Sequence, residues 1–111
     1  MNRKERRRQK KSISQNQVNS SLLDAIQLHI KKDFEKAENL YLKVIKNDQA
    51  NYQALRHLGI LYNDTKKYEK AIKYLTDAIN IAPSIPDAHN NLGLVYFVSD
   101  NLVSAKKSFE K

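Results

Sequence analysis

Three histidines, His29, His57 and His89, are the side chains in this sequence best suited to metal ligation or proton transfer. They fall at different positions of the repeat described below, so we expect them to point in different directions. None is paired at helical spacing with a carboxylate in a way that would face a shared cavity, as a metal or acid–base site requires. We therefore predict packing or groove histidines and no metal site.

Motifs for nucleophilic catalysis and phosphate binding are also missing from the sequence. The chain has no Cys, which excludes a thiol nucleophile, and it contains no Gly-x-Ser-x-Gly segment. Its two glycines, Gly59 and Gly93, are too far apart to form a phosphate-binding loop. The longest apolar run, Leu92–Val98, is too short to span a membrane. We predict no catalytic residue and no cofactor within these 111 residues.

Positive charge is concentrated at the start of the chain. Residues 1–12 hold seven basic side chains and one acidic side chain, a net charge of +6, whereas the other 99 residues carry 13 basic and 11 acidic side chains. The basic residues are Arg3, Lys4, Arg6, Arg7, Arg8, Lys10 and Lys11. This cluster could pair with nucleic-acid phosphates or another anionic surface, although no aromatic residue is interleaved for base stacking. The alternative is a solvated tail without a partner, because the segment lacks the apolar groups that would order it.

The rest of the sequence repeats with a period of 34 residues. Ala37, Ala71 and Ala105 are separated by this interval, and so are the pairs Gly59 and Gly93, Leu58 and Leu92, and Tyr62 and Tyr96. Within each period the apolar residues recur at helical spacing, and the polar segment 63–67 fits a tight turn. We predict helices over residues 19–31, 35–47, 52–63, 68–81, 86–98 and 102–111.

The small residues explain why the period is constant. Gly59 and Gly93 on the first helix of a pair, and Ala71 and Ala105 on the second, are expected where two helices approach closely. One helix pair cannot bury its apolar face alone, so neighbouring pairs must stack and share a core.

This pattern resembles the tetratricopeptide repeat. In the second unit the matching residues are Leu55, Leu58, Gly59, Tyr62, Tyr68, Ala71, Leu75, Ala78 and Pro83; in the third they are His89, Leu92, Gly93, Tyr96, Leu102, Ala105 and Phe109. The first unit matches through Ala25, Leu28, Phe34, Ala37, Tyr41 and Val44, but Asp24 replaces the usual Leu. The first-helix Trp of the family is replaced by Ser21, Leu55 and His89.

The resemblance implies an all-α fold, a right-handed α-α superhelix of about three tetratricopeptide helix-turn-helix repeats with a disordered basic N-terminal tail. The expected boundaries are 1–17 for the tail, 18–51 for repeat 1, 52–85 for repeat 2 and 86–111 for an incomplete repeat 3. The family implies a non-catalytic, cytoplasmic protein–protein interaction scaffold.

A concave groove that binds a peptide or a partner helix is the functional site that the resemblance implies. Its expected residues are Leu22, Ile26, His29, Ile30, Gln53, Arg56, Ile60, Asn63, Asp64, Asn90, Asn91, Leu94, Phe97 and Val98. Ile26, Ile60 and Leu94 would form an apolar stripe along the groove, which marks an interaction surface unless further repeats cover it.

Two specialised versions of the groove are known in the family, and the residues of this sequence match each of them only in part. A carboxylate clamp could use only Arg56 and Asn90, with Asp64 opposing them, although such a clamp needs several donors. The asparagine ladder of O-linked N-acetylglucosaminyl transferases is matched by Asn91, but its equivalents are His57 and Leu23.

The sequence stops at Lys111, inside the third repeat and without a polar capping helix. We hypothesise that the natural polypeptide continues. Similar bacterial arrays precede glycosyltransferase, sulfotransferase or methyltransferase domains, so the alternative function is the substrate-recruiting N-terminal arm of a larger enzyme.

Overall fold

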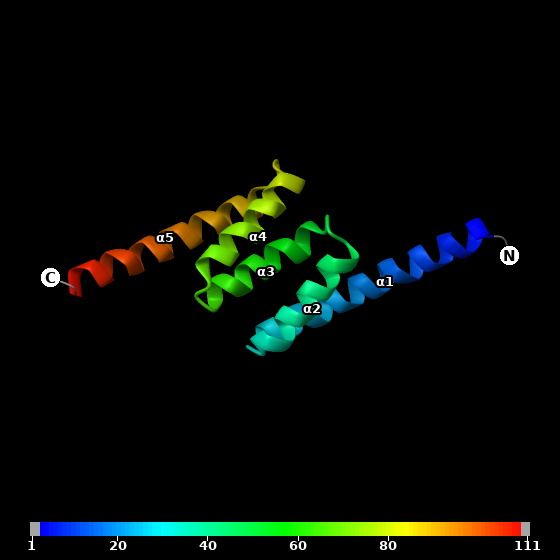
Figure 1. The fold of residues 1–111 in the computed structure, drawn as a ribbon, viewed down its shortest axis with the longest axis horizontal. Coiled ribbons are helices and arrows are strands. Elements are labelled where there is room, and N and C mark those ends of the chain that lie inside the picture. The colour runs from blue at the N-terminus through cyan, green and yellow to red at the C-terminus, as the bar shows by residue number, and fades with distance from the viewer. Residues whose placement is uncertain (1–2, 110–111) are drawn as a thin grey trace.

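A computed structural model describes the backbone of residues 3–109 and the side chains of residues 15–100. The described residues form five α-helices and no strand: α1 (Arg3–Ile30), α2 (Phe34–Asn47), α3 (Tyr52–Asp64), α4 (Tyr68–Ile81) and α5 (Pro86–Phe109). The helix α1 packs on α2 and α3 packs on α4, while α5 packs on α4 (Figure 1). This is the all-α architecture that the 34-residue period predicts.

The two helix pairs turn in the same way. Lys32 follows α1 and Lys66 follows α3, each in the left-handed conformation with φ of 65° and 64°. In each turn the next backbone N–H bonds back five residues: that of Asp33 to the Leu28 carbonyl at 2.9 Å, and that of Lys67 to the Tyr62 carbonyl at 2.7 Å. These are the bonds of a Schellman C-cap, made without glycine. The side chains of Asp33 and Asn51 then accept N–H bonds at the starts of α2 and α3.

The core lies where the small residues allow helices to approach. Ala37 and Ala71 are fully buried, as the repeat predicts. A Cβ atom added to Gly59 would lie 2.5 Å from Cγ of Leu75, so this position accepts only glycine without rearrangement. The side chain of Ala105 lies outside the described residues. The expected close approach is therefore observed between α3 and α4.

The N-terminal segment differs from the prediction. Residues 1–17 were expected to be a disordered tail, but α1 begins at Arg3 and projects beyond the end of α2 (Figure 1). Segment 3–30 contains neither Gly nor Pro, and its many Arg, Lys and Gln residues have good helix propensity. Once the packed part of α1 has formed, each added residue gains one backbone hydrogen bond, and the helix propagates.

The third unit also differs from the prediction. Separate helices were expected over 86–98 and 102–111, but α5 continues without a break to Phe109. Asp100, one period after Lys66, lies within the helix, so no left-handed residue opens a turn there. Gly93 consequently has nothing within 4 Å of an added Cβ, so the close approach expected there is not made. Tyr96 is 47% exposed although its equivalent Tyr62 is 3% exposed.

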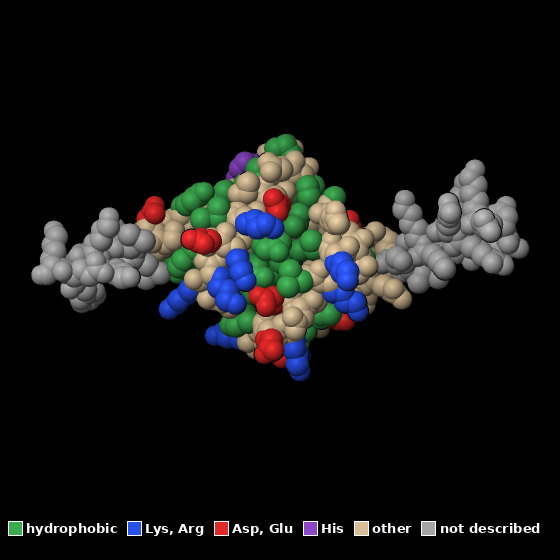
Figure 2. Space-filling view, in the orientation of Figure 1, with side chains coloured by type: hydrophobic (Ala, Val, Ile, Leu, Met, Phe, Trp, Pro, Cys, Tyr) green, Lys and Arg blue, Asp and Glu red, His purple; other side chains and the backbone are tan. Residues whose placement is uncertain are grey.

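Charged side chains are distributed over the helical body. Figure 2 shows Lys and Arg interspersed with Asp and Glu on the face that it presents, rather than gathered into a patch of one sign. This agrees with the small net charge of the sequence that follows the basic segment. The side chains of Arg3, Lys4, Arg6, Arg7, Arg8, Lys10 and Lys11 lie outside the described residues.

Candidate functional site

A hollow of about 770 Å³ opens between α1 and α3. Five predicted groove residues line it: Ile26, His29, Ile30, Ile60 and Asp64. Lys32, Phe34 and His57 complete the lining, although none was predicted to be a groove residue. The hollow therefore combines three isoleucine side chains with two histidines and two charged groups.

His29 connects three helices at the wall of this hollow. Its Nε2 lies 2.7 Å from Oδ2 of Asp64 on α3, and its Nδ1 lies 3.2 Å from the hydroxyl of Tyr41 on α2. A carboxylate can only accept, so Nε2–H donates to Asp64, and in the tautomer that carries its proton on Nε2 the Nδ1 atom accepts the Tyr41 hydroxyl proton. Burial raises the pKa of Tyr41 to about 12, so the hydroxyl stays protonated and able to donate.

His57 flanks the other side of Tyr41. The two rings stack, with centroids 6.2 Å apart and planes inclined by 6°. Burial, followed by the nearby Arg56 cation and His29, lowers the pKa of His57 to about 4, which keeps the ring neutral at pH 7. The prediction that the histidines point in different directions is wrong for His29 and His57. The position of each histidine in the repeat predicts only the direction in which it points from its own helix. It does not predict that Tyr41 of α2 lies between the two rings and contacts both.

A second polar group joins α3 to α5. The Arg56 guanidinium donates from Nη1 to Oδ1 of Asn91 at 3.3 Å and from Nη2 to Oε1 of Gln53 at 3.2 Å. No carboxylate among the described side chains lies within 4 Å of this cation. Neutral amide oxygens therefore orient Arg56. Arg56, considered above for a carboxylate clamp, and Asn91, considered for an asparagine ladder, thus contact each other.

The remaining predicted groove residues lie outside the hollow. Leu22 is half-buried against the core, and Asn63 is half-buried with its Oδ1 unbonded. On α5, Val98 is half-buried, whereas Asn90, Leu94 and Phe97 are exposed. Ile26 and Ile60 thus share one hollow while Leu94 does not line it, and a continuous apolar stripe stays a prediction.

Sequence reasoning missed Lys32 and Phe34 as lining residues because it assigned the groove to the first helices alone, and it missed His57 although this residue lies on the first helix of the second pair. Lys32 and Phe34 belong to the turn and to the start of α2, and the Phe34 ring contacts His29 edge-on with centroids 5.9 Å apart. His57 shares its repeat position with Asn91, and this equivalence could have identified it.

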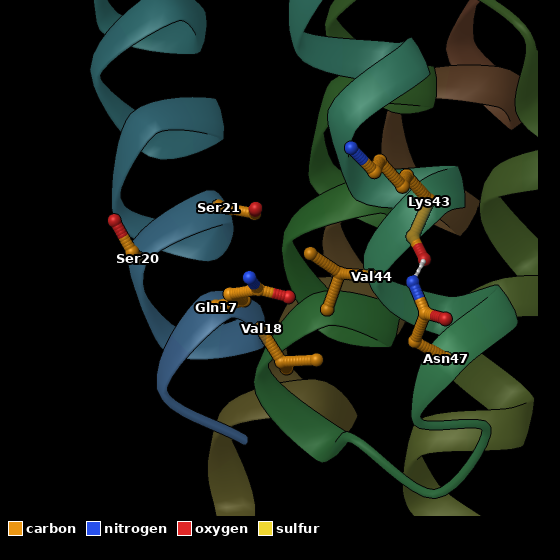
Figure 3. A pocket seen from close by; sticks show the side chains of 7 residues that line it. All are labelled: Gln17, Val18, Ser20, Ser21, Lys43, Val44 and Asn47. Carbon is orange, nitrogen blue, oxygen red and sulfur yellow. Dashed lines mark hydrogen bonds between the residues drawn. The ribbon is translucent and has the colours of Figure 1, made fainter. Parts of the chain in front are cut away.

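A smaller hollow of about 310 Å³ lies between α1 and the end of α2 (Figure 3). Its lining residues are Gln17, Val18, Ser20, Ser21, Lys43, Val44 and Asn47. Asn47 donates to the Lys43 carbonyl at 3.0 Å, and Lys43 is the one ionisable group in the lining. This composition offers neither a nucleophile–base pair nor a ligand cluster.

Clustered metal ligands and membrane-spanning helices are both absent from the part of the chain that the structure describes. No group of three or more His, Asp or Glu side chains among those residues could hold a metal ion. Among the helices of the described chain, none is both long and apolar enough to cross a bilayer.

Sequence comparisons place this chain among repeat-containing proteins. A family model described as TPR repeat matches residues 61–98. Mouse (Mus musculus) Protein O-mannosyl-transferase TMTC3 is 30% identical over 69 residues, which are 62% of this chain and 8% of the relative. The human (Homo sapiens) protein of the same name is 26% identical over 81 residues, 73% of this chain and 9% of the relative. The chain thus spans less than a tenth of these relatives.

Solved structures with the same fold include a peptide complex and an enzyme. The second TPR of Spaghetti (RPAP3) bound to an HSP90 peptide matches with a TM-score of 0.73 and 28% identity, over 89% of this chain and 94% of that chain. An O-GlcNAc transferase mutant of Thermobaculum terrenum matches with a TM-score of 0.72 and 25% identity, over 75% of this chain and 16% of that chain. With the paired helices, these similarities show a tetratricopeptide repeat fold, and the family match identifies residues 61–98 as tetratricopeptide repeat sequence.

Proposed function

We propose that this repeat region is a protein–protein interaction module that binds an extended peptide, or the helix of a partner, in the hollow between α1 and α3. The observation that carries the proposal is the convergence of Ile26, Ile30 and Ile60 in one open hollow bordered by polar groups. The similar RPAP3 repeat structure is bound to a peptide, which supports the same class of ligand.

The chemistry of the hollow suits an apolar ligand side chain with polar groups beside it. When an apolar side chain of a ligand enters the hollow, it and the isoleucines are removed from water. Full burial of such a side chain stabilises the complex by roughly 1.5–3 kcal/mol. Asp64 retains acceptor capacity beyond its bond to His29, and it can receive a backbone N–H of the ligand. The helices already hold these groups in place, so the ligand contributes most of the ordering cost.

The experiment compares two aspartate substitutions on binders selected from a peptide display library. Ile60→Asp puts a charge in the hollow, whereas Leu42→Asp alters an exposed apolar residue of α2 that does not line it. We expect Ile60→Asp to weaken binding by about tenfold or more and Leu42→Asp to leave it unchanged. Equal binding by both variants, with helicity retained by circular dichroism, would refute the proposal.

A second candidate function is the substrate-recruiting arm of a larger glycosyltransferase, with the catalytic residues outside the present chain. The similarity to TMTC3 and to an O-GlcNAc transferase favours this candidate, because both are named as sugar transferases. Sequencing the coding region after Lys111 tests it directly. A stop codon there would eliminate this candidate, whereas a transferase domain would support it. A cytoplasmic location is also proposed, and fractionation of cells expressing a tagged chain tests it.

A further inference from the structure

The Arg56 guanidinium lies at the edge of the hollow without an acidic partner. Its Nη2 is 3.4 Å from Nε2 of His57, and the His57 side chain lines the hollow. Arg56 is half-buried, and the structure places no carboxylate within 4 Å of it among residues 15–100. A half-buried cation has lost part of its hydration, and no opposite charge offsets that loss here. An anion of a ligand would supply the missing charge.

Hydrogen bonding at Arg56 is also incomplete. A guanidinium carries five N–H donors. Nη1 donates to Asn91 and Nη2 donates to Gln53, and both acceptors are neutral amide oxygens. Nε is buried and has no hydrogen-bond partner in the part of the chain that the structure describes. The two amides therefore hold the guanidinium in place, while the second N–H of Nη1 is left for a carboxylate, the acceptor that suits this group best.

The order of side chains along α3 determines where an acidic group of the ligand can lie. Arg56, Ile60 and Asp64 follow one another at intervals of four residues, so they lie along one side of the helix, about 6 Å apart along its axis. The apolar Ile60 thus separates the cation from the carboxylate of Asp64. Lys32 also lines the hollow and comes three residues after His29, the partner of Asp64, so the charges of Lys32 and Asp64 offset each other there. Only the Arg56 end offers an uncompensated positive charge.

An extended peptide presents side chains at the spacing of Arg56 and Ile60. Neighbouring side chains on one face of an extended chain are two residues apart, about 6–7 Å. A ligand residue that enters the hollow against Ile60 therefore brings the second residue along the chain to Arg56. We propose that the ligand is an acidic peptide, in which the side-chain carboxylate of an Asp or Glu two residues from the apolar anchor binds Arg56. This inference rests on the proposed function, because the anchor occupies the same hollow.

The first experiment selects ligands from a library of displayed peptides in which a central leucine is fixed and the other positions are random. We expect Asp or Glu to be enriched two residues from the leucine in selections on the unmodified chain. Selections on Arg56→Gln should lose this enrichment, because glutamine keeps a hydrogen-bond donor but removes the charge. Lys46→Gln is the matched control: it removes the same charge from an exposed residue of α2 outside the hollow, and the enrichment should persist.

The second experiment measures the affinity of a selected peptide and of its analogue in which the acidic residue is replaced by its amide. Both peptides carry an amidated C-terminus, so the only carboxylates are those of side chains. We expect the amide analogue to bind the unmodified chain and Lys46→Gln about tenfold more weakly than the acidic peptide. With Arg56→Gln the two peptides should differ by less than about twofold.

Equal binding of the acidic and amide peptides to the unmodified chain would overturn the proposal, and this result does not depend on the folding of any variant. The proposal also fails if Arg56→Gln, with helicity retained by circular dichroism, still prefers the acidic peptide tenfold. A peptide that binds only with a free C-terminus would assign the anion to the terminal carboxylate instead.

Ile60→Asp separates this proposal from the proposed function. If that substitution weakens both peptides while the chain shows no preference for the acidic one, the hollow is the binding surface and the role of Arg56 is refuted. If Ile60→Asp weakens neither peptide, the hollow is not the binding surface and both proposals fail.

Discussion

The contact between Gly59 and Leu75 gives the sharpest test of the packing. A Cβ on residue 59 would lie 2.5 Å from Cγ and 2.9 Å from Cδ2 of Leu75, which is fully buried and cannot move aside freely. Overpacking of this kind costs about 1–3 kcal/mol. Alanine gains about 1 kcal/mol over glycine in helix propensity. We expect Gly59→Ala to lower the free energy of unfolding by up to about 2 kcal/mol.

A second substitution reverses the sign of this effect. Leu75→Ala alone should cost about 2–5 kcal/mol because it leaves a cavity. When residue 75 is Ala, the Cβ that Gly59→Ala introduces no longer meets a leucine side chain. Only the gain in helix propensity from glycine to alanine then affects stability. The double variant should therefore be more stable than Leu75→Ala by about 1 kcal/mol.

Urea unfolding followed by circular dichroism measures all four proteins of this cycle. Gly93→Ala is the control: its added Cβ meets nothing, so the free energy of unfolding should rise by about 1 kcal/mol. The reasoning is refuted if Gly59→Ala has the same effect whether residue 75 is Leu or Ala.

Three further predictions concern the hollow and the basic segment. Tyr41→Phe removes the donor to His29, and the free energy of unfolding in urea should fall by about 0.5–1.5 kcal/mol, an effect that His29→Ala should largely remove. The pKa of His57 is lowered from 6.5 to about 4, so the unfolded chain binds more protons and stability should fall as pH decreases through that interval. A His57→Gln variant should show a flatter stability profile over the same pH range; an unchanged profile would contradict the burial of His57. A nucleic-acid role for the basic segment requires that deletion of residues 1–12 lower salt-dependent binding of RNA in a filter assay, and unchanged binding would exclude that role.

The sequence determines the central helices closely. The expected ranges 35–47, 52–63 and 68–81 differ from α2, α3 and α4 by at most one residue at either end. This agreement arises because the period places small residues at close contacts and polar segments at turns. It does not reveal that Lys32 and Lys66 adopt left-handed conformations, because neither is a glycine.

The two ends of the fold and the polar contacts of the hollow were harder to predict. Low apolar content suggested disorder before Val18, but helix propensity extends α1 to Arg3. The His29–Asp64 contact joins residues 35 positions apart, so no local spacing reveals it. Tyr41 was assigned to packing from the repeat, and its role as a donor to His29 emerges only when α1, α2 and α3 are placed together.

The measurement that tests the central claim most directly is a backbone-amide NMR titration of the chain with a selected peptide. We predict chemical-shift changes concentrated on residues lining the hollow, His29, Ile60 and Asp64 among them, with little change at Ile72 and Tyr74 of α4. Shifts confined to α4, with the hollow unaffected, would contradict the assignment of the hollow between α1 and α3 as the binding surface.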